Sequence, residues 1–129
     1  MTPAPTAEMY ETAIRSMDIA KALTETSRKL LRKLYAGPGH TLTTMEIARE
    51  MGWPTHGAVN LHYGTFAQTL AKRMRWVVPA GAYQIATIAT FEGGSADDPH
   101  TRWTMRPELA TALEKLKIVM PARPAPPKV

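Results

Sequence analysis

The sequence predicts a mainly α-helical fold with one small β-hairpin. Apolar residues recur at spacings of three and four through most of the first 74 residues, which indicates amphipathic helices. From residue 83 to residue 91, Ile, Thr and aromatic residues alternate with a period of two instead, which indicates a strand. The polar loop 93–99 and the segment TRWTM at 101–105 follow. The chain can therefore turn back and pair with this strand as a hairpin.

Two helices are expected before residue 40. The first spans residues 7–20, and Thr6 is placed to cap it. Its apolar stripe consists of Met9, Ala13, Ile14, Met17 and Ala20. The second begins near Thr24, buries one leucine-rich side, and ends at the Gly-Pro-Gly sequence 37–39, which cannot continue a helix.

The segment 43–74 predicts two more helices joined by a tight turn. The Gly-Trp-Pro sequence at 52–54 ends the first, because Gly tolerates a left-handed backbone and Pro disfavours a helical residue before it. Thr55 is expected to cap the second, which makes His56 about its first residue. Its apolar stripe is Val59, Tyr63, Phe66, Leu70 and Met74. This pattern is that of a helix-turn-helix.

A final helix is predicted to start at Pro107, whose missing N–H would be unpaired there in any case. A helix-turn-helix followed by a two-stranded hairpin is a winged helix-turn-helix, here with an N-terminal helix and a closing C-terminal helix. We therefore divide the chain into a partly flexible N-terminal helix (1–23), a winged helix-turn-helix domain (24–120) and a disordered Pro-rich tail (121–129).

Composition limits the function classes. The 129 residues suit one small domain, and the absence of cysteine excludes disulfides and cysteine chemistry. No apolar run approaches a membrane span, and the N-terminus lacks a secretory signal, so we expect a soluble cytoplasmic protein without a membrane partner. The four histidines are scattered, and no nucleophile elbow or phosphate loop is present. Asp97 and Asp98 are interpreted as solvated turn residues. We expect no enzymatic activity, no metal and no cofactor.

Charge points to duplex DNA. The chain has a net charge of +5, and residues 28–75 hold eight bases against two acids, where phosphate contacts would be needed. A solvated basic face is the alternative. His56 and Asn60 are predicted to read bases, although Asn60 could instead bridge the bend at Gly64. Trp53 and Trp103 are expected to be largely buried. The predicted nucleic-acid-binding residues are Arg28, Lys29, Arg32, Lys33, Thr55, His56, Asn60, Gln68, Lys72, Arg73 and Arg75, with Thr65 as a further helper.

Three segments carry a resemblance to a known family. These are YAGPGHTLTTMEIAREMGW at 35–53, AVNLHYGTFAQTLAKRM at 58–74 and WTMRPELATALEKL at 103–116. They resemble the helix-turn-helix modules found beside HNH nuclease domains in predicted bacterial restriction-type proteins. The resemblance covers residues 34–120 and implies DNA binding by analogy. Nuclease activity is not carried over, because no room for a nuclease domain remains after residue 120.

These observations predict a small DNA-binding protein, either a transcriptional regulator or an accessory protein. One alternative is a protein-interaction module of the same fold. Another is a phage-encoded or mobile-element-encoded inhibitor of a host defence complex, of the anti-CRISPR or anti-restriction type. A homodimer is also predicted, because the apolar face of helix 7–20 would lack a partner within a winged helix-turn-helix. Paired helices would then read half-sites about 34 Å apart.

Overall fold

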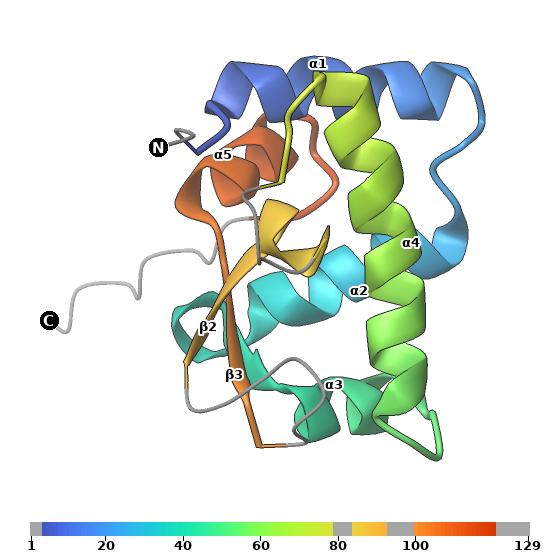
Figure 1. Cartoon of the computed structure of the whole chain (residues 1–129), viewed down its shortest axis with the longest axis vertical. Coiled ribbons are helices and arrows are strands. Elements are labelled where there is room, and N and C mark those ends of the chain that lie inside the picture. The colour runs from blue at the N-terminus through green and yellow to red at the C-terminus, as the bar shows by residue number, and fades with distance from the viewer. Residues whose placement is uncertain (1–3, 79–83, 93–99, 121–129) are drawn as a thin grey trace, which may run out of the picture.

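The computed structural model describes residues 4–78, 84–92 and 100–120. The described residues form five α-helices and a small three-stranded antiparallel sheet (Figure 1). The helices are α1 (Ala7–Ile19), α2 (Glu25–Ala36), α3 (Thr44–Met51), α4 (Gly57–Met74) and α5 (Pro107–Lys115). The strands are β1 (Thr41–Thr43), β2 (Ala89–Glu92) and β3 (Arg102–Met105), and the 3-10 helices are η1 (Pro38–His40) and η2 (Gln84–Thr87). The prediction of a mainly helical chain with little β-structure is confirmed.

Threonine caps begin three of the helices, and the predicted cap at Thr6 is confirmed. The hydroxyls of Thr6 and Thr24 accept hydrogen bonds from backbone N–H groups at the starts of α1 and α2. Thr43 caps α3 and forms a reciprocal capping box with Glu46. The prediction that Thr55 caps α4 is wrong. His56 directly precedes α4, and its backbone is already helical (φ −72°, ψ −17°). The helix therefore has no extended residue at its start whose hydroxyl could accept from the first turn.

The sheet has the order β1-β3-β2, with β3 in the centre. The predicted return strand is confirmed, since β3 pairs antiparallel with β2 and places Trp103 opposite Phe91. Strand β1, on the other side of β3, was not predicted. The strand predicted for 83–91 is half wrong, because η2 occupies its first part and only 89–92 pair.

The first part of the predicted strand is a 3-10 helix because the segment is buried on more than one side. Thr87, Ile88 and Ala89 are consecutive and all buried, which a strand with one solvent-exposed face does not allow. Segment η2 packs against α4 instead of extending the sheet. Residue 83, the predicted start of the strand, lies outside the described residues.

Helix α1 belongs to the same hydrophobic core as the rest of the chain. It packs across α4 and α5, and Ile14 and Met17 are fully buried there (Figure 1). The Tyr10 hydroxyl also donates a hydrogen bond to the Thr87 carbonyl at 2.5 Å. The premise of the dimer prediction, an apolar face of this helix without a partner in its own chain, is therefore wrong. Ala20, assigned to that face, is exposed.

Trp53 and Trp103, both expected to be largely buried, differ in their burial. Trp103 is fully buried and makes edge-to-face contacts with Tyr63 and Phe91, as expected. Trp53 is only half-buried, and its ring stacks on His62 at the surface. Among the described residues, no helix is long and apolar enough to cross a membrane.

Candidate nucleic-acid interface

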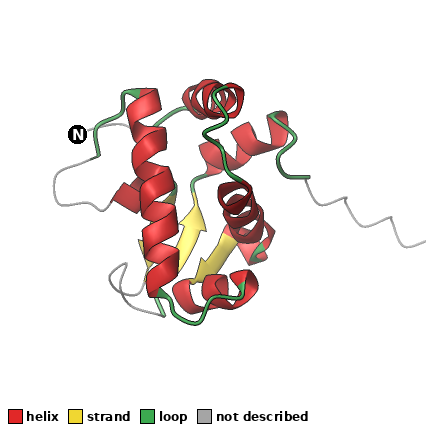
Figure 2. Ribbon diagram, turned by 90° about the vertical axis from the view of Figure 1, so that its right-hand side faces the viewer, coloured by secondary structure: helices red, strands yellow, loops and turns green. Residues whose placement is uncertain are grey.

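Helix α4 runs along one side of the molecule, from α3 to α1, with one face in the core and one toward solvent (Figure 2). Its 18 residues span about 27 Å at 1.5 Å per residue. The buried face is formed by Val59, Tyr63, Phe66, Ala67, Leu70 and Ala71. The exposed residues Leu61, Thr65, Gln68 and Lys72 follow each other at spacings of three and four, so they form one outer stripe. Between Glu50 and Glu92 the sequence contains no acidic residue.

The predicted base-reading residues are not all on this stripe. Gln68 is on it, Thr55 is exposed just before the helix, and His56 is half-buried at its start. The Oδ1 atom of Asn60 is buried and has no hydrogen-bond partner. Because Asn60 immediately follows the buried Val59 and precedes the buried Tyr63 by one turn, its side chain is drawn toward the core side of the helix.

The predicted phosphate-binding residues form two groups, one on α2 and one at the C-terminal end of α4. In the first group, Arg28 forms ion pairs with Asp18 and Glu25. The Nε of Arg32 donates to the Ile118 carbonyl (3.0 Å), and the Nζ of Lys33 lies 3.3 Å from a carboxylate oxygen of Glu50. In the second group, Arg73 donates to the Ser16 hydroxyl at 2.7 Å. These four side chains are partly neutralised or engaged within the chain.

Three of the predicted bases remain available. The side chains of Lys29, Lys72 and Arg75 are exposed and make no ion pair or hydrogen bond with the part of the chain that the structure describes. Lys72 continues the outer stripe of α4, and Arg75 ends that helix. Lys29 lies on α2. The structure therefore leaves one unpaired base exposed on α2 and two exposed at the C-terminal end of α4.

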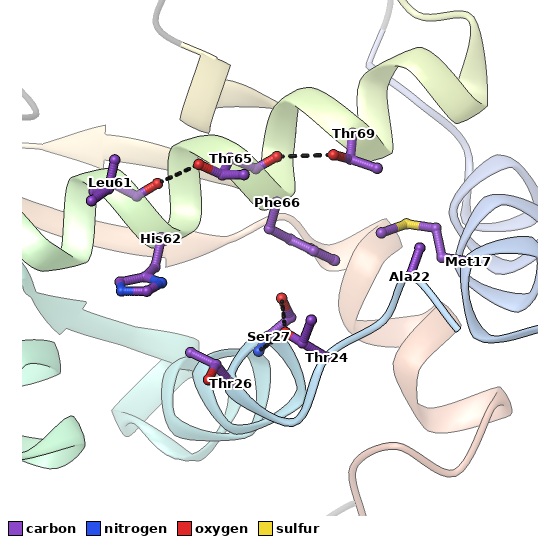
Figure 3. Close-up of a pocket in the computed structure, with 10 residues that line it drawn as sticks. All are labelled: Met17, Ala22, Thr24, Thr26, Ser27, Leu61, His62, Thr65, Phe66 and Thr69. Carbon is purple, nitrogen blue, oxygen red and sulfur yellow. Dashed lines mark hydrogen bonds between the residues drawn. The ribbon is translucent and has the colours of Figure 1, made fainter. Parts of the chain in front are cut away.

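A trough separates α4 from the first turn of α2 (Figure 3). Its main hollow has a volume of about 420 Å³, and His62 and Phe66 point into it from α4. Five hydroxyl side chains line it: Thr24, Thr26, Ser27, Thr65 and Thr69. Sequence reasoning missed this trough. Its only signal was the hydroxyl-rich start of α2 and the two threonines one turn apart on α4.

A second hollow, of about 390 Å³, adjoins the first at His62 and Thr26. Lys29 and Arg32 line it together with Trp53. The rings of Trp53 and His62 stack with centroids 4.6 Å apart and planes inclined by 23°. We call the two adjoining hollows together the α2–α4 trough, with hydroxyls at one end and two bases beside an aromatic pair at the other.

A buried tyrosine holds the two walls of the trough together. The Tyr63 hydroxyl on α4 donates to the Leu30 carbonyl on α2 at 2.5 Å. Burial raises the pKa of the Tyr63 phenol above its ordinary value of 10.0, so the group stays protonated and keeps its donor role. This hydrogen bond therefore links α4 directly to α2.

Within the described residues, no three His, Asp or Glu side chains lie together in a way that could hold a metal ion. Comparisons with models of protein families, with curated proteins and with solved structures find no match for the chain.

Proposed function

We propose that the chain binds double-stranded DNA as a winged helix-turn-helix. In this proposal α3 and α4 are the helix pair, α4 enters the major groove, and β2 and β3 form the wing. The order α2-β1-α3-α4-β2-β3 and the central position of β3 support it. The observation that carries the proposal is the outer stripe of α4, which no described element covers and which lies in a stretch of 41 residues without a single acid.

Charge placement supports the same orientation. Lys72 and Arg75 lie at the C-terminal end of α4, where a helix seated in the groove comes close to the DNA backbone. Lys29 lines the α2–α4 trough, which borders the outer stripe at Leu61 and Thr65. A base beside the stripe and two at its C-terminal end, with an uncharged stretch between, suit a duplex, whose phosphates flank the groove and whose floor carries no charge.

The test is a fluorescence-anisotropy titration with random-sequence duplexes across a range of salt. The double variant Lys29→Ala/Lys72→Ala removes two exposed, unpaired charges. We expect weaker binding and a slope of log affinity against log salt that is smaller by about two, since each lost phosphate contact removes about 0.9. Lys115→Ala, at an exposed lysine of α5, is the matched control and should leave the slope unchanged. Failure to bind any duplex at about 50 mM salt, where phosphate contacts are strong, excludes the proposal.

A protein-binding role is the second candidate, and one observation favours it. Leu61 is 67% exposed at the N-terminal end of the outer stripe, which suits a protein partner as well as a groove. An inhibitor of a host defence complex belongs to this class. The same titration separates the two candidates. A module that binds only a protein partner does not need to bind duplex DNA, so it does not need a salt-dependent contribution from Lys29 and Lys72.

A further inference from the structure

We propose that α4 recognises thymine in the major groove, through contact of its C5-methyl group with Leu61 and the Thr65 methyl. Gln68, next along the stripe, would bond an adjacent adenine. This inference rests on the proposed DNA-binding function and adds to it the chemistry that is read. It also replaces His56 and Asn60 as the principal reading residues.

The N-terminal half of the stripe, at Leu61 and Thr65, offers methyl groups and no free donor. The Thr65 hydroxyl donates to the Leu61 carbonyl at 2.9 Å, and the Thr69 hydroxyl donates to the Thr65 carbonyl at 3.1 Å (Figure 3). A hydroxyl has a single hydrogen, so neither threonine can donate to a base without breaking its bond within the helix. What Thr65 presents beside the exposed Leu61 is mainly its methyl group.

The stripe up to Gln68 also lacks the charged side chains that most often read guanine and cytosine. The commonest specific contact to guanine comes from Arg or Lys, and residues 57–71 contain neither. The same stretch has no Asp or Glu that could accept from the amino group of cytosine. The thymine C5-methyl is the one apolar group on the major-groove edges of the four ordinary bases, and it matches the apolar surface of Leu61 and the Thr65 methyl.

The spacing of these side chains along α4 matches that of neighbouring base pairs. Leu61 and Thr65 are four residues apart, so they are separated by about 6 Å along the helix. Gln68 is exposed three residues further on, and its amide can bond adenine at N6 and N7. The three side chains thus cover about 10 Å, or about three base-pair steps. A site of consecutive A·T pairs fits this length.

The experiment begins with selection of bound sequences from a pool of randomised duplexes. Each thymine of the selected site is then replaced in turn by deoxyuridine, which lacks only the C5-methyl. We expect at least one position at which deoxyuridine weakens binding about fourfold, the factor that corresponds to burying one methyl group. Leu61→Ala should discriminate less between thymine and deoxyuridine duplexes at that position.

Two variants control for folding and for general surface effects. Thr65→Ser keeps the hydroxyl that bonds the Leu61 carbonyl and loses only the methyl, so it should reduce the discrimination without changing thermal unfolding. Ile19→Ala changes an apolar residue of α1 that is 78% exposed and lies off the stripe, and it should retain the full discrimination.

Three outcomes overturn the inference while leaving DNA binding intact. They are equal affinity for thymine and deoxyuridine at every position, selected sites that lack thymine, and unchanged discrimination in Leu61→Ala. Failure of the wild-type chain to bind any duplex overturns this inference and the proposed function together.

Discussion

Replacing Tyr63 by Phe should destabilise the protein at neutral pH and stabilise it above about pH 10.6. At neutral pH the substitution removes the hydrogen bond from the Tyr63 hydroxyl to the Leu30 carbonyl, which spans the two walls of the α2–α4 trough. A buried hydrogen bond contributes about 1 kcal/mol net to the free energy of unfolding. The Phe variant should therefore be less stable by about that amount at pH 7.

The reversal follows from the raised pKa of Tyr63. Above pH 10 the unfolded chain releases the phenolic proton, while the folded chain keeps it because burial raises the pKa of this group from 10.0. The folded state then binds more protons than the unfolded state, so stability falls as the pH rises. At pH 11 this loss is about 1.4 kcal/mol for one such tyrosine, which exceeds the value of the hydrogen bond. Phe has no proton to lose, so the variant escapes this penalty.

Urea unfolding followed by circular dichroism, at pH 7 and pH 11, measures both effects. The difference between wild type and Tyr63→Phe should change sign, from about 1 kcal/mol in favour of wild type to about 0.4 kcal/mol in favour of the variant. Other groups that titrate in this range affect both proteins and cancel in the difference. Tyr10→Phe should behave alike, since Tyr10 is buried, has a raised pKa for the same reason and bonds the Thr87 carbonyl. A difference that stays constant with pH would show that the reasoning is wrong.

Further expectations concern stability, and urea unfolding measures each. Asn60→Ala should leave stability unchanged or raise it, since the buried Oδ1 has no partner to lose; a clear loss would contradict its lack of a partner. Gly52→Ala should cost about 1 kcal/mol, because Gly52 has φ 72°, although a methyl group there meets no atom within 4 Å. Thr43→Ala should cost about 1 kcal/mol through loss of the α3 cap. Ile14→Ala should cost about 2–5 kcal/mol; a loss well below this range would mean that α1 is dispensable to the core.

The helices could be predicted from the sequence because their signals are local. Thr6, Thr24 and Thr43 each precede an apolar run of helical period, and each is a cap in the structure. Pro107 begins α5 for an equally local reason. A cap needs only a hydroxyl and a backbone N–H a few residues away, so the chain around it determines the outcome.

The strand pairing and the exposure of the site residues could not be predicted, because they depend on tertiary contacts that sequence spacing does not reveal. Strand β1 has three residues and exists because β3, some 60 residues later, pairs with it. The alternation in residues 84–87 was a poor guide because α4 covers this segment, a tertiary contact that overrides β-propensity. Asn60 looked like a base-reading residue by type, and only the rotation of α4 against the core shows that its oxygen is buried. Burial of a polar atom is a property of the assembled core.

The length of α4 explains why α1 is part of the core. The helix is about 27 Å long, whereas strands of three or four residues reach only about 13 Å. The sheet therefore supports only part of α4, and the rest would expose Phe66 and Leu70 without α1 and η2. In the proposed DNA complex, the length of α4 also allows its two ends to contact different parts of the duplex. Its N-terminal part, up to Gln68, faces the bases, and its C-terminal end, held by α1, carries Lys72 and Arg75 toward the phosphates.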